Sequence, residues 1–234
     1  MSLVVLEGNI GGGKSSVLIE LKKMGFRVEQ EAVVDPESMF SRALRTQSTF
    51  HLQVAASIDT YVRLDKISNM TALPDVQCFM ERGRTGLDTF LQVAKEQKMV
   101  STLEYDLCRA LKTTKEKATP QYPKMIVYLD VDPALCLQRV RTRDRNGEEG
   151  ITLEYLECID RWYRTILFNT PHSCVVAKVT VQKESSAHDV ATAVVAAVRS
   201  AETTNDKNQR GAIWDPFQSN TGNPKDRRNG SVGA

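Results

Sequence analysis

A glycine-rich segment near the start of the chain has the residues and spacing of a phosphate-binding loop. Residues 8–15 read Gly-Asn-Ile-Gly-Gly-Gly-Lys-Ser and match the pattern GxxxxGK(S/T), between an apolar run and a helical pattern. In that setting backbone N–H groups surround phosphate oxygens, the lysine reaches the β- and γ-phosphates, and the serine hydroxyl ligates Mg²⁺. We therefore predict an ATP site with Mg²⁺ as cofactor, whose binding residues are Gly8, Asn9, Ile10, Gly11, Gly12, Gly13, Lys14, Ser15 and Ser16.

Acidic residues follow two later apolar runs, where strands of an α/β sheet would end. Glu31 follows the second run, and Glu81 with Arg82 follows the third. Ligands of open α/β sheets lie beyond the carboxyl ends of the strands, so these side chains would face the phosphate loop. We predict that Glu31 takes the proton of an attacking hydroxyl and that Arg82 grips an oxygen or orients this base. Glu81 would hold Mg²⁺ together with Ser15. The alternatives are a solvated acid for Glu31 and a salt-bridged strand end for Glu81.

Arginines gather in the segment 139–149, which ends a predicted helix and contains an Asn-Gly pair. Exposed ion pairs contribute little stability, so this density favours phosphate binding by planar guanidinium groups. We predict that Arg139, Arg143 and Arg145 belong to a lid that binds ATP, with Arg143 and Arg145 also catalytic. A solvated charged helix and a nucleic-acid patch are the alternatives, and the net charge of +2 argues against the second.

Composition excludes several classes of protein. The 234 residues suffice for one α/β domain, and the five scattered cysteines contain no CxxC pair, which disfavours a disulfide framework or a zinc site. No apolar run reaches transmembrane length, and an apolar strand pattern begins by residue 3. We expect a cytoplasmic protein with no nucleic-acid or membrane partner.

Apolar runs alternate with helical patterns along residues 1–201. The predicted strands are residues 3–7, 26–30, 76–80, 125–131 and 174–181, and the predicted helices are residues 14–24, 48–70, 85–97, 101–115, 133–143, 152–168 and 187–201. Continuous apolar strands are typical of a parallel sheet covered on both faces. We predict an α/β fold, a P-loop three-layer sandwich with a five-stranded parallel sheet and a helical arginine-rich lid. The polar residues 202–234 are expected to form a disordered tail.

Taken together, these motifs resemble the deoxyribonucleoside kinase family, which includes deoxycytidine, deoxyguanosine and mitochondrial thymidine kinases and viral relatives. The family's loop GNIGxGK(S/T) matches residues 8–15, its E-P-V segment matches Glu31-Ala32-Val33, and its E-R-S motif matches Glu81-Arg82-Gly83. Its lid pattern, an arginine run followed by glutamates and G-I-P-L-x-Y-L, matches residues 139–156. The resemblance spans about residues 3–200 and implies ATP-dependent phosphorylation of a deoxyribonucleoside 5′-hydroxyl by a homodimer.

The resemblance also implies substrate-binding residues. Besides Glu31 and Arg82, Gln53 would read the base, Phe90 would stack on it, and Glu148, or alternatively Glu149, would bind the sugar 3′-hydroxyl. The family's sugar-binding tyrosine falls near Phe40, which lacks a hydroxyl. Gly83 replaces the serine of E-R-S, and the tryptophan that follows the catalytic glutamate has no counterpart.

Two other functions remain open at this point. A thymidylate-type nucleoside monophosphate kinase would share the fold and the lid, but it needs a cation for the acceptor phosphate, and Gln30 precedes Glu31 here. A nucleotide-binding regulator that has lost catalysis is the other alternative, and the presence of Lys14, Ser15, Glu31, Glu81 and Arg82 argues against it.

Overall fold

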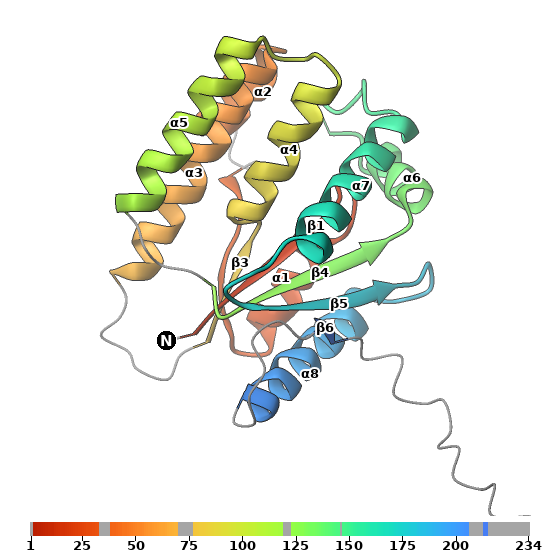
Figure 1. Ribbon diagram of the computed structural model, residues 1–234. Coiled ribbons are helices and arrows are strands. Elements are labelled where there is room, and N and C mark those ends of the chain that lie inside the picture. The colour runs from red at the N-terminus through yellow and green to blue at the C-terminus, as the bar shows by residue number, and fades with distance from the viewer. Residues whose placement is uncertain are drawn as a thin grey trace, which may run out of the picture.

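The chain forms a parallel β-sheet with helices on both faces in a computed structural model (Figure 1) that describes residues 2–32, 38–69, 77–118, 123–145, 147–205 and 213–214. The strands are β1 (Ser2–Gly8), β2 (Arg27–Glu29), β3 (Gln77–Glu81), β4 (Met125–Val131), β5 (Val175–Val181) and β6 (Ile213–Trp214). Their order is β2-β3-β1-β4-β5-β6, and every pairing is parallel. The predicted five-stranded parallel sheet is confirmed, and β6 adds a two-residue edge from the segment expected to be a tail.

The helices follow the predicted ranges closely. They are α1 (Lys14–Lys23), α2 (Met39–Arg45), α3 (Thr49–Ser68), α4 (Arg84–Glu96), α5 (Thr102–Ala118), α6 (Pro133–Arg143), α7 (Leu153–Asn169) and α8 (Ala187–Asn205). The sequence analysis did not predict α2, and α8 continues past the proposed boundary at residue 201. Apart from β6, residues 206–234 lie outside the described residues, and so does the tail expected there.

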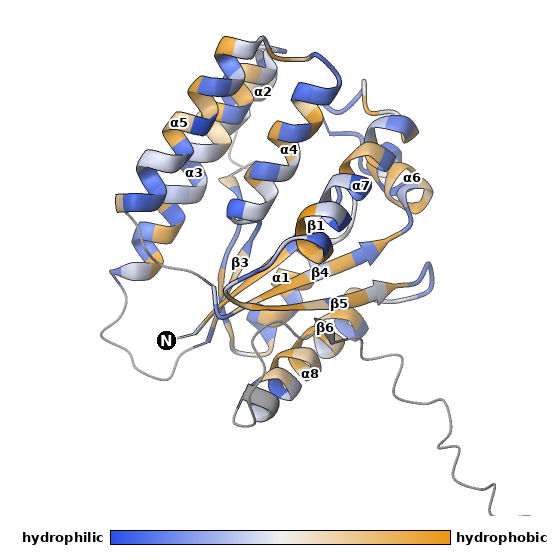
Figure 2. Cartoon of the chain, viewed as in Figure 1, coloured by the Kyte–Doolittle hydropathy of each residue, from blue (hydrophilic) through white to orange (hydrophobic). Residues whose placement is uncertain are grey.

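The two faces of the sheet are covered by different helices. Val4 and Leu6 of β1 pack with side chains of α1, whereas Leu3 and Val5 pack with side chains of α3. Helix α8 lies on the same side as α1, and α3, α4, α5 and α7 gather on the other side (Figure 1). Burial on both faces explains why β4 and β5 are mainly apolar, as their largely orange colouring in Figure 2 shows.

The position of β1 in the sheet determines where a ligand can bind. The connection that leaves β1 runs through α1 to β2 on one side of the sheet, whereas the connection that leaves β3 crosses to β4 on the other side of β1. The neighbouring strands β1 and β3 therefore flank a topological switch point. Leu6 lies beside Glu81 of β3, and Gly8 lies beside Leu129 of β4. The carboxyl ends of β1 and β3 therefore open into one crevice, where the phosphate loop begins.

Two further predictions from composition can be compared with the fold. All five cysteines are free, and four of them are buried. Among the helices of the described ranges, none is long and apolar enough to cross a membrane.

Candidate active site

The phosphate loop runs from β1 into α1 and is held by close backbone packing. Gly11 and Gly13 have φ values of 75° and 86°, a region that favours glycine. A Cβ on Gly11 would lie 2.4 Å from the carbonyl oxygen of Cys136 on α6, so no side chain fits there. Asn9 Nδ2 donates to the Leu156 carbonyl of α7 at 2.8 Å. The loop is thus fixed between α6 and α7, at the N-terminus of α1, a position suited to an anion.

Lys14 lies inside this loop. Its Nζ donates to the carbonyl oxygens of Gly8 at 2.9 Å and Asn9 at 2.7 Å. Burial, together with the nearby Arg82 guanidinium, lowers the pKa of Lys14 to about 8. Among the described residues, no carboxylate is paired with this ammonium, and the oxygens of a phosphate bound in the loop would give it negatively charged partners.

Ser15 and Glu81 come from different elements and meet beside the loop. Ser15 Oγ donates to Glu81 Oε1 at 2.8 Å. Hydroxyl and carboxylate oxygens are the hard ligands that Mg²⁺ takes, and in nucleotide sites phosphates and water complete its shell. The described residues contain no cluster of three His, Cys, Asp or Glu side chains that could bind a metal alone. The pair fits a metal that arrives with a nucleotide.

Glu31 and Arg82 form a buried ion pair at the neighbouring strand ends. Arg82 Nη1 donates to Glu31 Oε2 at 2.5 Å, although 51 positions separate the residues. Burial alone would lower the pKa of Arg82, but Glu31 and the surrounding acidic groups outweigh it and raise the pKa. The φ of Arg82 is 47°, and a non-glycine residue in this region costs about 1–3 kcal/mol unless its surroundings hold it. This strained residue directly contacts the predicted base.

One cavity of about 750 Å³ joins most of the predicted residues. Its lining includes Ile10, Gly11, Gly12, Gly13, Lys14, Ser15, Ser16, Glu31, Gln53, Glu81, Arg82, Phe90, Arg143, Arg145 and Glu148. Gly8, Asn9 and Arg139 do not line it, although Arg139 Nη1 would lie 3.7 Å from a Cβ on Gly13. The side chain of Phe40, in α2, lies outside the described residues.

The lid places arginines and a glutamate in contact. Arg143 donates to Glu148 through Nε at 2.8 Å and through Nη2 at 2.5 Å, and Arg145 Nη1 lies 3.7 Å from the same carboxylate. Glu149 instead accepts the backbone N–H of Gly147 at 2.9 and 3.0 Å. The structure thus pairs the arginines expected to bind phosphate with the carboxylate expected to bind the sugar.

The residues with which α3 and α4 line the cavity are uncharged. Gln53 of α3 is buried there, and Phe90 of α4 packs against Arg82, with the guanidinium carbon 4.9 Å from the ring centroid. The next residue, Leu91, belongs to a separate apolar cluster, so α4 lines the cavity with the aromatic ring of Phe90. Among the lining residues that were not predicted from the sequence are Ala56, Thr60, Leu87 and Tyr155. The spacing of Gln53, Ala56 and Thr60 at helical intervals was a signal that could have found two of them.

Glu7 was also missed, although it is the most buried carboxylate near the site. It accepts the backbone N–H groups of Gly83 at 2.9 Å and Gly86 at 3.0 Å, and the Tyr163 hydroxyl at 3.0 Å. Gly83, the N-cap residue of α4, has no capping side chain, so Glu7 caps this helix from β1. Burial raises the pKa of Glu7 to about 7, despite these three hydrogen bonds and Arg82. A charged residue at the end of an apolar strand was the available signal.

The raised pKa of Glu7 predicts a pH-dependent stability. The contribution of protonated Glu7 to the free energy of unfolding is fully present below the unfolded-state pKa of 4.5. It is lost as the pH rises through about 7, the pKa in the folded chain. The free energy of unfolding of the wild type should therefore fall relative to Glu7→Gln by about 3 kcal/mol between pH 4.5 and 8. Urea unfolding of both proteins at several pH values measures the difference. Parallel pH curves would contradict a titrating Glu7.

Comparisons with known proteins agree with the geometry. A family model described as deoxynucleoside kinase matches residues 4–202. The chain belongs to the deoxynucleoside kinase family. It is therefore a kinase, a nucleotide-binding transferase, as the resemblance of its motifs predicted. This result does not favour the monophosphate kinase or an inactive regulator.

Individual relatives of this deoxynucleoside kinase family member differ in coverage. The thymidine kinase of Ictalurid herpesvirus 1 is 26% identical over 176 residues, covering 69% of this chain and 72% of the relative. The deoxyguanosine kinase of Dictyostelium discoideum is 44% identical over 45 residues, only 19% of this chain and 16% of that protein. A solved structure of deoxyadenosine kinase from M. mycoides, with dCMP and dCDP bound, is similar with a TM-score of 0.69 and 18% identity, covering 85% of this chain and 99% of that one. This last likeness concerns the fold.

Proposed function

We propose that the chain transfers the γ-phosphoryl group of ATP to the 5′-hydroxyl of a deoxyribonucleoside. One observation carries the proposal. The Glu31–Arg82 pair and the phosphate loop line the same cavity, to which α3 contributes a buried amide, Gln53, and α4 an aromatic ring, Phe90. A nucleoside that binds against α3 and α4 would direct its sugar hydroxyl toward a carboxylate beside the phosphate loop.

Glu31 would act as the general base. The carboxylate is buried, and Arg82 donates a hydrogen bond to one of its oxygens, Oε2. Its remaining lone pairs can accept the 5′-hydroxyl proton as the new O–P bond forms. Arg82 would keep the carboxylate in place and present a planar fork toward the transferred group.

The donor side would be assembled by the phosphate loop and the lid. Lys14 would give up its carbonyl contacts for the β- and γ-phosphates, while Ser15 and Glu81 would hold Mg²⁺. When bound, Mg²⁺ neutralises charge that develops on the phosphoryl oxygens. Arg143 and Arg145 lie at the cavity and would bind the same oxygens when the lid closes.

The residue beside the proposed base is uncharged, which favours a phosphoryl acceptor that is itself uncharged. Gln30 directly precedes Glu31, and its amide Nε2 donates to the Ser15 carbonyl at 3.2 Å. A nucleoside monophosphate would need a cation at this position to neutralise the acceptor phosphate, and an amide does not provide one. This contact supports a nucleoside, which has no acceptor phosphate, over a nucleoside monophosphate.

An assay panel tests the proposal directly. Purified protein with ATP and Mg²⁺ is offered four deoxynucleosides and, separately, four deoxynucleoside monophosphates. We expect 5′-monophosphates from at least one deoxynucleoside and no diphosphates. Turnover of monophosphates alone would favour the monophosphate kinase, and no turnover of either set would favour a regulator.

Glu148 provides a prediction for the sugar. A carboxylate that accepts the 3′-hydroxyl contributes roughly 1.5–3 kcal/mol, so Glu148→Ala should lower kcat/KM for 2′-deoxynucleosides by about 10–100-fold. The same substitution should change kcat/KM for 3′-deoxy analogues much less. Glu149→Ala is the matched control because Glu149 bonds the Gly147 backbone instead. Equal losses for both substrate types would remove Glu148 from this role.

Assembly and location form a separate part of the proposal. The apolar side chains of Val62 on α3 and of Leu103 and Leu107 on α5 are 59%, 69% and 50% exposed, and the two helices pack side by side. An apolar surface of this kind supports a homodimer through α3 and α5. The five free cysteines support a reducing compartment, the cytoplasm. Sedimentation analysis of the purified chain measures its assembly state.

A further inference from the structure

A buried ion pair on α3 lies behind the two strand ends that carry Glu31 and Arg82. Arg63 is buried, and its Nε donates to Asp59 Oδ2 at 2.8 Å, one helical turn earlier. Neither residue lines the cavity. A buried charge pair is a weak source of stability, because desolvation offsets the attraction. Stability alone therefore does not explain why this ion pair is placed beside the site.

Arg63 contacts the backbone that carries Arg82. Its Nη1 donates to the Glu81 carbonyl at 2.5 Å and lies 3.4 Å from the Arg82 carbonyl. These carbonyls flank the residue whose φ is 47°. On the other side of the same turn, Glu7 accepts the N–H of Gly83. The Arg63 guanidinium binds carbonyl groups of the turn, and the Glu7 carboxylate binds an N–H group of the same turn. The left-handed conformation of Arg82 is therefore held from both sides.

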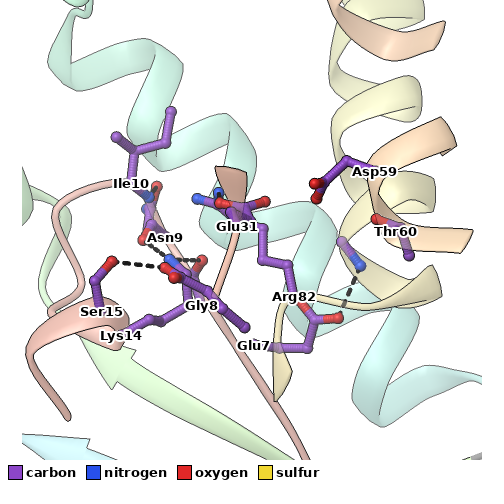
Figure 3. Close-up of polar contacts among 12 residues, drawn as sticks. Glu7, Gly8, Asn9, Ile10, Lys14, Ser15, Glu31, Asp59, Thr60 and Arg82 are labelled. Carbon is purple, nitrogen blue, oxygen red and sulfur yellow. Dashed lines mark hydrogen bonds and ion pairs between the residues drawn. The ribbon is translucent and has the colours of Figure 1, made fainter. Parts of the chain in front are cut away.

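Asp59 extends the contact to the catalytic carboxylate. The backbone N–H of Ala32, which directly follows Glu31, hydrogen bonds to Asp59. Figure 3 shows the Asp59 carboxylate pointing from α3 toward Glu31. Asp59 and Arg63 together therefore reach the end of β2 and the end of β3, the two segments whose side chains must meet at 2.5 Å.

We propose that Asp59 and Arg63 are positioning residues for phosphoryl transfer, which hold Glu31 and Arg82 at the distance and orientation that catalysis needs. The inference rests on the proposed function, since it assigns these residues to the geometry of its catalytic pair. They touch neither ATP nor the nucleoside. Their effect should therefore appear in kcat rather than in the binding of either substrate.

The first test separates turnover from binding. Arg63→Gln should lower kcat by about 10–100-fold, because a displacement of about 1 Å at a catalytic group can cost 10²-fold. KM for ATP and the nucleoside dissociation constant should change by less than about 3-fold. Lys66→Gln is the matched control, since Lys66 lies on the same helix and its ion pair with Glu29 lies outside the cavity. The control should keep wild-type kcat.

The second test asks whether Arg63 acts through Arg82. In an Arg82→Ala background, Arg63→Gln should lower the single-turnover rate by less than about 3-fold, because residues that act as one unit are not additive. A full 10–100-fold loss in both backgrounds would show an independent structural role and overturn the inference. Wild-type kcat in Arg63→Gln would also overturn it.

Folding is checked by circular dichroism and thermal unfolding of each variant. If Arg63→Gln does not fold, Asp59→Ala takes its place, because alanine removes the carboxylate that accepts from Arg63 and from the Ala32 N–H. Asp59→Ala should lower kcat in the same direction, and an unchanged kcat would contradict the inference. A wild type that phosphorylates no deoxynucleoside would instead overturn the proposed function, so the two failures are distinguishable.

Discussion

Replacing Glu31 by glutamine should lower kcat by about 10²–10⁴-fold, the range expected when a general base is lost. A hydroxyl is a poor nucleophile while it keeps its proton, and an amide cannot accept that proton. Glutamine preserves the shape of the side chain, and its oxygen can still accept from Arg82. Binding of ATP and of the nucleoside should therefore remain close to wild type, and titration calorimetry measures both.

Glu29→Gln is the control for this experiment. Glu29 belongs to the same strand region, is also buried, and pairs with Lys66 at 2.8 Å, but it does not line the cavity. Its substitution should leave kcat within a few-fold of wild type. Near-normal turnover of Glu31→Gln would mean that the proton leaves by another route and that the family's catalytic glutamate corresponds to a different residue.

Replacing Arg143 by alanine should lower kcat by about 10²–10³-fold, the usual loss when one donor to a developing negative charge is removed. The guanidinium lies at the cavity and donates to Glu148. Phosphoryl oxygens gain negative charge in the transition state and would then compete with Glu148 for the Arg143 guanidinium. Nucleoside affinity should change little, which separates a role in transfer from a role in substrate binding.

Arg141→Ala is the control for the lid. Arg141 lies two positions earlier on α6 and does not line the cavity, so kcat should stay near wild type. Rapid-quench kinetics with each variant measures the transfer step itself. If Arg143→Ala weakens nucleoside binding and leaves the transfer rate unchanged, the arginine serves the sugar side through Glu148.

Long elements could be predicted from the sequence because their signals are local. The apolar runs that became β1, β4 and β5 are continuous, and the helical pattern after each of them repeats with the period of an α-helix. Asp132 followed by Pro133 is a local signal for a helix start, and the Asp132 side chain does accept the Ala134 N–H at 2.7 Å. Such signals depend on residues within a few positions of each other.

The short elements were not predictable in this way. Helix α2 (Met39–Arg45) has seven residues, and β6 (Ile213–Trp214) has two, within a polar segment. An isolated helix of this length is not stable in water, so its existence depends on packing, here against α3. Strand β6 forms because β5 offers an open edge to pair with.

The sequence by itself determined the phosphate chemistry, since Lys14, Ser15 and the glycines stand in one continuous motif between a strand and a helix. Only the tertiary structure decided which distant charges meet. Glu7 caps α4 from 76 positions away, and Arg63 reaches the backbone of Arg82 from α3. These contacts depend on strand order, register and helix placement, which arise from packing across the whole chain rather than from any local pattern.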